Sequence, residues 1–262
     1  MILLCCISSC SISHNLCYFD NYPMKVLVLA SGFGTRLYPL TINKAKALLD
    51  YKGKPLLTHI VAKVPEAIDI LISTNRKFEA DFCRWQKGIN RRVEICIEDV
   101  WIEKQDKGAV GSLNFWVSRK AIAEDLLVIA GDNYFELDFS LFIASYNGKN
   151  TLVAVHDIGD KSKASQFGVA RLDGHKIIEL QEKPANPESS LIATACYILP
   201  PRIFPFLSQY CSEGIRDNLG SFIAYLIDRD EVHAYVFDEL WLDVASTSAY
   251  NLPRQDSSGN YQ

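Results

Sequence analysis

Glycines and charged residues gather where a predicted strand ends, which is where side chains can meet a ligand. The first such place is the loop Ser31-Gly32-Phe33-Gly34-Thr35-Arg36-Leu37, which follows a short apolar run. Glycines let a backbone turn sharply and bring its N–H groups close to phosphate oxygens. The loop lacks the third glycine of a dinucleotide fingerprint, because Leu37 stands there, and it lacks the Gly-Lys-Ser/Thr ending of a P-loop. Taken alone, it is equally compatible with a glycine turn that binds nothing.

Three more charged side chains are candidates for a site. Asp132 follows the run 127–130, Lys183 follows Leu180-Gln181-Glu182, and Asp243 follows Trp241-Leu242. Each has a plainer interpretation. An aspartate after a strand is often a turn residue bonded to its own backbone, a lone lysine is most often a solvated surface charge, and a tryptophan before a carboxylate is equally compatible with core packing. None of the three establishes a site by itself.

The elements that would position these side chains are predicted from hydrophobic patterning. After residue 24, apolar runs rich in β-branched residues alternate with stretches of helical period, which is typical of a parallel sheet covered by helices. The predicted strands are Lys25–Ala30, Asp69–Ser73, Val93–Glu98, Leu126–Ile129 and Thr151–His156. The predicted helices are Leu56–Val64, Lys77–Lys87, Val110–Lys120 and Leu137–Tyr146. We expect a doubly wound α/β fold with ligands at the carboxyl ends of its strands.

A second pattern begins after about residue 160. Three shorter alternating segments, Gly168–Leu172, Lys176–Gln181 and Ala195–Leu199, are separated by turn signals such as Asp173-Gly174. They predict a small antiparallel extension beside the first half. The sequence has no internal repeat and no long polar linker, so we expect residues 24–262 to form one domain, with a first half of about 24–157 and a second of about 158–262.

Composition excludes some classes of partner. The chain has 262 residues, 48% of them hydrophobic and 22% charged, as in an ordinary globular protein. Its formal net charge of −4 gives no indication of a basic surface that would bind nucleic acid, although binding of a small anionic ligand stays possible. Four of the eight cysteines fall in the first seventeen residues, and the others are scattered singly with no Cys-x-x-Cys pair. We therefore expect reduced cysteines and a cytoplasmic protein with no membrane span, and leave a homo-oligomer open.

The first 23 residues differ from the rest. They contain one charged residue, Asp20, and precede Met24. They fit neither a secretory signal, which needs a basic start, nor a spanning helix, which needs about 20 apolar residues. We interpret residues 1–23 as a non-native start or a disordered leader, with translation beginning at Met24. The intact mass of protein made from the native gene tests this.

The continuation of the glycine-rich loop makes the pattern specific. Thr35 to Thr41 reads Thr-Arg-Leu-Tyr-Pro-Leu-Thr, and Lys44-Ala45-Lys46-Ala47-Leu48-Leu49 follows. This resembles the sugar-1-phosphate nucleotidyltransferase family, especially glucose-1-phosphate thymidylyltransferases, which open with Gly-x-Gly-Thr-Arg-Leu-x-Pro-Leu-Thr and a later Pro-Lys-x-Leu. Ala45 departs from the family proline. The segments 108–111, 131–133, 182–184, 194–199 and 241–246 match further family motifs in the same order, with Ala195 and Ala245 standing where the family has glycine.

The resemblance implies a fold, a cofactor and roles for particular residues. The fold would be a Rossmann-like mixed sheet flanked by helices, the nucleotide-diphospho-sugar transferase fold, and Mg²⁺ would be held by Asp132 and Asp243. The implied catalytic residues are Arg36, Lys46 and Lys183. The implied nucleotide-binding residues are Leu29, Ala30, Gly32, Gly34, Thr35, Gly108 and Gly111. The implied sugar-phosphate-binding residues are Gly168, Glu182, Lys183 and Tyr197.

The implied reaction joins a nucleoside triphosphate to a sugar 1-phosphate with release of pyrophosphate. The residues at 108–111 and 131–133 most resemble those of thymidylyltransferases, which implies dTTP and glucose 1-phosphate as substrates. UTP, CTP or GTP and mannose 1-phosphate remain open. Two alternatives come from other classes. One is a non-catalytic regulatory relative, for which the alanines noted above are the only hint, since all five charged site residues are present. The other is a nicotinamide-dependent oxidoreductase, against which the missing third glycine counts.

Overall fold

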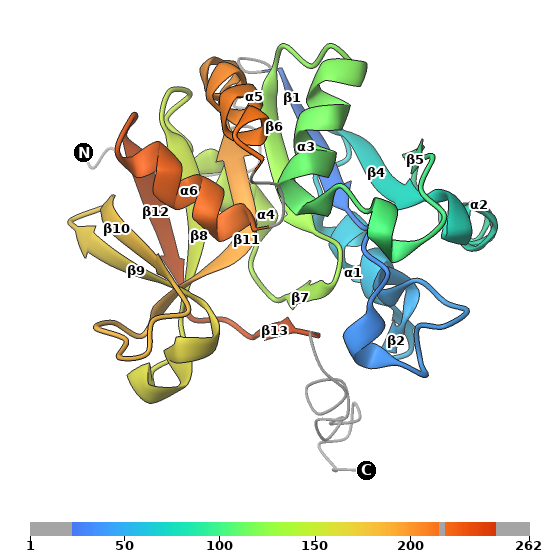
Figure 1. The fold of residues 1–262 in the computed structure, drawn as a ribbon, viewed down its shortest axis with the longest axis horizontal. Coiled ribbons are helices and arrows are strands. Elements are labelled where there is room, and N and C mark those ends of the chain that lie inside the picture. Colours follow the sequence, from blue (N-terminus) through green and yellow to red (C-terminus); the bar gives the residue numbers. More distant parts are fainter. Residues whose placement is uncertain (1–22, 215–217, 245–262) are drawn as a thin grey trace, which may run out of the picture.

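The structure, a computed structural model, describes residues 23–214 and 218–244. Residues 1–22 of the predicted leader lie outside the described residues, as does Ala245. Within the described part, nine strands form one mixed sheet in the order β5-β4-β1-β6-β11-β8-β12-β10-β9 (Figure 1). In chain order these strands are β1 (Met24–Leu29), β4 (Asp69–Asn75), β5 (Glu94–Glu98), β6 (Asp125–Ala130), β8 (Thr151–Asp157), β9 (Gly168–Asp173), β10 (Lys176–Glu182), β11 (Leu191–Leu199) and β12 (Val232–Phe237).

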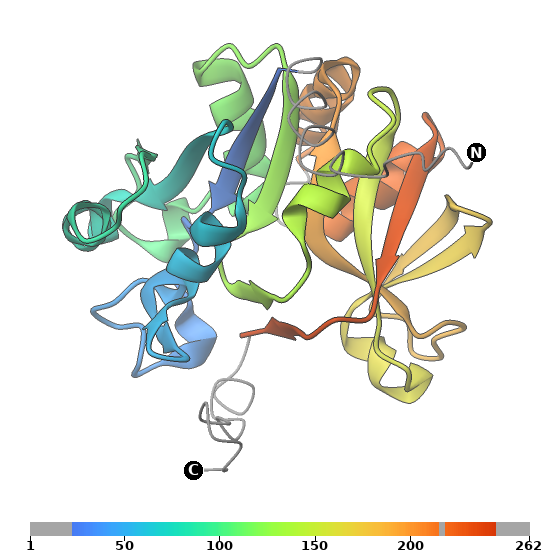
Figure 2. The same ribbon diagram turned by 180° about the vertical axis from the view of Figure 1, so that it is seen from behind.

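Helices cover both faces of the sheet because its strands are apolar on both sides. Val26 and Val28 of β1 pack on one face with helices α1 (Leu56–Lys63), α2 (Glu79–Lys87) and α4 (Phe139–Ala144). Leu27 and Leu29 point to the other face and pack with α3 (Gly108–Arg119), α5 (Phe204–Ser212) and α6 (Leu219–Ile227). Successive side chains of a strand point to opposite faces, so one strand contributes to two cores. Figure 2 shows α1 and α4 in front of the sheet, on the face opposite α3, α5 and α6.

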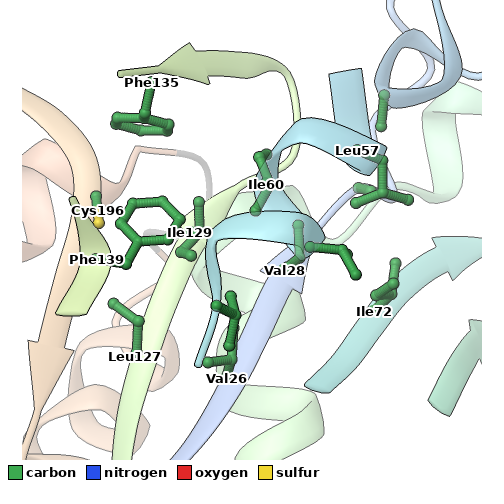
Figure 3. Close-up of a cluster of buried hydrophobic side chains, with 14 of the residues drawn as sticks. Val26, Val28, Leu57, Ile60, Ile72, Leu127, Ile129, Phe135, Phe139 and Cys196 are labelled. Carbon is green, nitrogen blue, oxygen red and sulfur yellow. The ribbon is translucent and has the colours of Figure 1, made fainter. Parts of the chain in front are cut away.

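The first of these cores joins segments from the whole first half of the sheet. Figure 3 shows Val26, Ile72, Leu127 and Ile129 from three neighbouring strands pointing toward the same layer of side chains as Ile60 of α1. All five side chains are at most 2% exposed. Burial of this kind fixes how β1 and β6 lie side by side, and therefore where their carboxyl ends meet.

The five strands predicted in the first half are confirmed as β1, β4, β5, β6 and β8, and the four predicted helices as α1 to α4. Two helices start later than predicted because a capping residue precedes them. Asp138 accepts hydrogen bonds from the N–H groups of Ser140 and Leu141, so α4 begins at Phe139. Asn75 caps a 3₁₀ turn over Arg76–Phe78, and α2 follows it from Glu79.

The second half is arranged differently from the prediction in one respect. β9 and β10 form the expected antiparallel extension at one end of the sheet, but the segment Ala195–Leu199 is not part of it. It belongs to β11, which lies between β6 and β8 in the centre of the sheet and runs antiparallel to both. Cys196, Ile198 and Leu199 are fully buried there, because both faces of a central strand are covered.

A short pair of strands lies below the carboxyl end of β6. β7 (Asn133–Phe135) pairs antiparallel with β13 (Trp241–Asp243), with Asp243 opposite Asn133. A second short pair, β2 (Asp50–Tyr51) and β3 (Lys54–Pro55), precedes α1. The β7–β13 pairing joins residues from the two halves of the sequence, and it positions the candidate site described next.

The cysteines in the described residues are free, as predicted: Cys83, Cys96, Cys196 and Cys211. Burial raises the pKa of the Cys96 thiol to about 11, so it stays protonated at neutral pH. These residues behave as small hydrophobic side chains.

Candidate active site

The glycine-rich loop follows β1 and turns back through a 3₁₀ turn over Thr35–Leu37. Gly34 adopts φ +64°, in the left-handed region that favours glycine, and its carbonyl accepts a hydrogen bond of 2.6 Å from the Thr41 hydroxyl. On the other side of the loop, Asn75 Nδ2 donates to the carbonyl of Ser31 at 2.6 Å. Both ends of the loop are therefore fixed by hydrogen bonds from outside it.

The end of β6 approaches this loop closely because residue 131 is glycine. Gly131 N–H donates to the carbonyl of Leu29 at 2.8 Å. A Cβ at Gly131 would lie 3.0 Å from that carbonyl oxygen and 3.0 Å from the Cβ of Ala30. Glycine thus lets Asp132, the next residue, stand directly beside the glycine-rich loop.

Lys46 and Asp132 form an ion pair at this point. Lys46 Nζ lies 2.6 Å from Asp132 Oδ2, and Asn133 Nδ2 donates to the other carboxylate oxygen at 2.8 Å. Burial raises the pKa of Asp132, but the Lys46 charge and the hydrogen bonds from Lys46 and Asn133 outweigh it, so the pKa is lowered overall. Asp132 is therefore ionised at neutral pH.

A second carboxylate faces the first. The β7–β13 pairing sets Asp243 opposite Asn133, and Val244 N–H donates to the carbonyl of Asp132 at 3.3 Å. Burial and the charge of Asp132 raise the pKa of Asp243 to about 6, against the opposing charges of Lys46, Arg36 and Lys183. Two neighbouring, partly buried carboxylates of this kind form a suitable pair for a hard divalent cation.

The side chains of this carboxylate pair limit which metal ion it could hold. Among the described residues, no group of three or more His, Cys, Asp or Glu side chains is arranged to hold a metal ion. Two carboxylates alone suit Mg²⁺, which keeps several water or phosphate oxygens in its coordination shell, better than zinc, which takes three or four protein ligands. Asp132 and Asp243 thus fit a magnesium ion better than a zinc ion.

Two cavities meet at Asp132. The smaller, of about 220 Å³, is lined by the glycine-rich loop, Lys46 and Asp132. The larger, of about 880 Å³, is lined by residues that include Asp243, Lys183 and Tyr197. Arg36 and Asp132 line both cavities. The arrangement can hold two anionic ligands, one in each cavity, with cationic side chains and the carboxylate pair between them.

Residues of the second half close the larger cavity. Glu182 lies against the start of α6: a Cβ at Gly220 would be 2.8 Å from Glu182 Oε2, and one at Gly168 would be 3.2 Å from it. Lys183 has φ +47°, and its N–H donates to the carbonyl of Phe167 at 2.9 Å. Its side chain is 56% exposed and its Nζ lies 3.9 Å from Glu182 Oε1, so it is free to reach an anion in the cavity.

The structure brings most of the residues predicted for the site together. The smaller cavity is lined by Leu29, Ala30, Gly32, Gly34, Thr35, Arg36, Lys46 and Asp132. The larger cavity is lined by Gly168, Glu182, Lys183, Tyr197 and Asp243. Gly111 differs, because it lines a separate hollow between α3 and α5. Gly108, at φ +71°, is the first residue of α3, and its neighbour Ala109 lines the larger cavity.

Three polar residues at or near the site were not predicted from the sequence. Asn133 donates a hydrogen bond to Asp132, and Asn218 lines the larger cavity and caps α6. Glu103 accepts a 2.8 Å hydrogen bond from the Thr35 hydroxyl. A signal existed for two of them. Asn133 follows Gly131-Asp132 directly, and Asn218 precedes an apolar helical run as an N-cap does.

The family to which the fold and site belong is shown by comparison with known proteins. A model of the nucleotidyl transferase family matches residues 25–255 of this chain. The chain therefore belongs to the nucleotidyl transferase family.

Individual relatives have several specificities. The chain is 27% identical over 230 residues to a putative mannose-1-phosphate guanyltransferase of Sulfolobus acidocaldarius, covering 87% of this chain and 61% of that protein. It is 30% identical to the bifunctional protein GlmU of Methanocaldococcus jannaschii, covering 84% of this chain and 51% of that protein. It is 30% identical over 186 residues to the UTP–glucose-1-phosphate uridylyltransferase AglF of Haloferax volcanii, covering 69% of this chain and 74% of that protein. The chain spans only 51% to 61% of the length of the first two relatives.

Solved structures share the fold. A putative glucose-1-phosphate thymidylyltransferase from Bacillus anthracis, in complex with a sucrose, superimposes with a TM-score of 0.76 at 24% identity, covering 87% of this chain and 92% of that one. This likeness supports the mixed α/β fold with helices on both faces. No described helix has the length and apolarity that a membrane span requires.

Proposed function

We propose that the protein transfers a nucleotidyl group from a nucleoside triphosphate to a sugar 1-phosphate, releasing pyrophosphate. One observation carries the proposal: the Lys46–Asp132 ion pair stands where two cavities meet, with Asp243 and Arg36 beside it. The glycine-rich loop of the smaller cavity suits a triphosphate, because its backbone N–H groups and Arg36 are donors to phosphate oxygens. The larger cavity suits the sugar phosphate, with Lys183 as its cation.

In the proposed reaction, an oxygen of the sugar 1-phosphate attacks the α-phosphorus of the triphosphate. A new P–O bond forms, the bond from the α-phosphorus to the bridging oxygen breaks, and pyrophosphate leaves with the electron pair. No proton has to be removed from the nucleophile, because a phosphate oxygen is already anionic at neutral pH. The task of the protein is to hold two anions in line and to neutralise charge on the transferring group.

Each charged residue has a distinct part in this scheme. Arg36, which lines both cavities, reaches the phosphates from the loop side, and Lys183 holds the sugar phosphate. The Lys46 ammonium group, which has more than one N–H donor, donates to phosphate oxygens as well as to Asp132. Asp132 and Asp243 would hold Mg²⁺, which when bound supplies positive charge to the phosphate oxygens.

We also propose which nucleotide and which sugar phosphate are used. The resemblance of segments 108–111 and 131–133 to thymidylyltransferases favours dTTP and glucose 1-phosphate. A second pair, GTP and mannose 1-phosphate, is favoured by the similarity to the putative mannose-1-phosphate guanyltransferase of Sulfolobus acidocaldarius. A panel of dTTP, UTP, CTP, GTP and ATP against glucose and mannose 1-phosphates, read as nucleotide-sugar formed, separates the two. Product with dTTP and glucose 1-phosphate supports the first pair, and a preference for GTP overturns it.

The same assay tests whether the chain is an enzyme or a non-catalytic relative. With Lys183→Ala we expect nucleotide-sugar formation to fall by on the order of a hundredfold or more, because a cation that opposes developing charge is lost. Lys163→Ala is the matched control, since Lys163 is exposed and pairs only with Asp160 of its own 3₁₀ turn among the described residues. No product from the wild-type protein with any substrate pair, while triphosphate still binds, would favour the regulatory relative.

A further inference from the structure

Buried polar side chains support the glycine-rich loop from within the protein and are not used by the proposed reaction. Ser31 Oγ lies 3.1 Å from Ser112 Oγ of α3. The Ser112 hydroxyl in turn interacts with the carboxyl group of Glu98, the last residue of β5, and opposes the rise in its pKa that burial causes. Trp116 Nε1 donates to Glu98 Oε1 at 3.2 Å. A carboxylate accepts hydrogen bonds, so the Ser112 hydroxyl donates to Glu98 and accepts from the Ser31 hydroxyl.

Glu98 is an unusual residue for this place. It is 1% exposed, and no cation of the described chain lies within salt-bridge distance of it. Burial raises the pKa of its carboxyl group, against the hydrogen bonds from Ser112 and Trp116. An apolar side chain of similar size would avoid this cost, because a buried acid without an ion-pair partner is unfavourable. We therefore explain the presence of a carboxyl group at this position by its interaction with Ser112, on the side of the glycine-rich loop.

The loop depends on such support. Gly32 lines the smaller cavity, and a Cβ built on it would meet nothing within 4 Å, so that side of the residue is open. Its two neighbours hold it: Phe33 is buried in the core against Phe78, and Ser31 is fixed by hydrogen bonds. Ser31 is held on its backbone by Asn75, whose Nδ2 donates to the Ser31 carbonyl, and on its side chain by Ser112. The side-chain half of this support ends on Glu98.

We propose that Glu98, acting through Ser112 and Ser31, is a positioning residue that holds the glycine-rich loop in the shape that receives a triphosphate. That a triphosphate binds to this loop rests on the proposed function, whereas the shape of the loop is a property of the ligand-free protein.

Two variants and one control test the proposal. Glu98→Leu removes the acceptor at the end of the chain of hydrogen bonds, and Glu98→Gln keeps an acceptor without the charge. Asp125→Asn is the control, because Asp125 is also a buried acid with a hydroxyl donor, Tyr146 at 3.1 Å, but it lies at the amino end of β6, away from the cavities. Backbone hydrogen exchange of residues 30–34 is measured in the protein without ligand. The kcat and the KM for each of the two substrates are measured by steady-state kinetics.

We expect Glu98→Leu to speed exchange in residues 30–34 and to raise the KM for triphosphate, each by about tenfold, the loss of roughly one buried hydrogen bond. The KM for sugar phosphate and kcat should stay within about twofold of wild type. Glu98→Gln should restore most of both effects, and Asp125→Asn should show neither. This split separates a positioning role from a general loss of stability, which would move all of these quantities together.

The proposal is overturned if residues 30–34 exchange at the wild-type rate in Glu98→Leu. It is also overturned if Asp125→Asn has an equal effect. If Glu98→Leu does not fold, Ser112→Ala removes the middle of the chain of hydrogen bonds and is measured in the same way, with the same expected result. If the wild-type protein transfers no nucleotidyl group at all, the proposed function fails, while the exchange measurement still decides whether Glu98 positions the loop.

Discussion

Lys46 Nζ lies 2.6 Å from Asp132 Oδ2, although one residue comes from a 3₁₀ turn after the glycine-rich loop and the other from the end of β6. The pair stands between the two cavities, and its carboxylate also faces Asp243. The ion pair fixes the position of the Lys46 ammonium group beside the smaller cavity.

Replacing this lysine should remove most of the activity. We expect Lys46→Met to lower kcat/KM for triphosphate by on the order of a hundredfold to a thousandfold, because a pre-positioned charge is lost from the reacting phosphates. Lys44→Met is the control, since Lys44 is exposed and outside both cavities. Steady-state kinetics of the two variants check this, and similar values for both would argue against a role for Lys46.

Metal removal should stop turnover reversibly. Treatment with EDTA is expected to abolish product formation, and added Mg²⁺ to restore it, because no histidine, cysteine or further carboxylate of the described residues joins Asp132 and Asp243 in holding the ion. Asp243→Asn should raise the Mg²⁺ concentration needed for half-maximal activity by about tenfold or more. Full activity in EDTA would refute the magnesium assignment.

The close approach of β6 to the loop predicts a specific effect at Gly131. Gly131→Ala should lower kcat strongly, because its Cβ would lie 3.0 Å from the Leu29 carbonyl oxygen and must push Asp132 away from the loop. Gly88→Ala, at the end of α2, would meet its nearest atom at 3.4 Å and serves as the control. Circular dichroism checks folding of both, and equal activity of both variants would show that the close approach does not matter.

Ala195 carries a local backbone strain. It stands where the resembling family has glycine, and it adopts φ +53° at an irregularity in the β11–β8 pairing. A left-handed backbone costs a non-glycine residue about 1–2 kcal/mol, whereas glycine in a strand costs about 0.5–1 kcal/mol. Ala195→Gly should therefore raise Tm slightly, by about 1–3 °C. Ala193→Gly, in the same strand without positive φ, should lower it, and the reverse order would contradict this explanation.

Stability should depend on pH through Glu98. Because burial raises its pKa above the ordinary 4.5 in the folded protein, the stability that goes with its protonated form is fully present below about that pH and is lost as pH rises through the folded-state value. Glu98→Gln does not titrate. The difference in Tm, variant minus wild type, should therefore be larger at pH 8 than at pH 4.5, and thermal melts at the two values measure it. A constant difference would show that Glu98 has an ordinary pKa.

Local patterns in the sequence predicted much of the fold. The first-half strands are short apolar runs rich in β-branched residues, so β1, β4 and β6 and the loops after them follow from hydrophobic periodicity. β11 does not, because it returns from the second half to lie beside β6, and an alternating segment carries no mark of which strand it will join.

The site was predictable to a similar extent. Asp132 and Lys183 stand at strand ends, so their place near a ligand follows from the fold class. The meeting of Asp243 with Asp132 depends on the β7–β13 pairing between distant segments, which no spacing in the sequence encodes. The Ser31–Ser112–Glu98 chain likewise joins three elements, and each of its members is an unremarkable residue when taken singly.

Release of pyrophosphate tests the central claim most directly. Wild-type protein is mixed with a nucleoside triphosphate, a sugar 1-phosphate and Mg²⁺, and pyrophosphate is followed over time beside Asp132→Asn. We predict that release requires both substrates, equals the nucleotide-sugar formed mole for mole, and falls by orders of magnitude in the variant while its fold is retained. Release without the sugar phosphate, or near-normal release by Asp132→Asn at saturating Mg²⁺, would contradict the account.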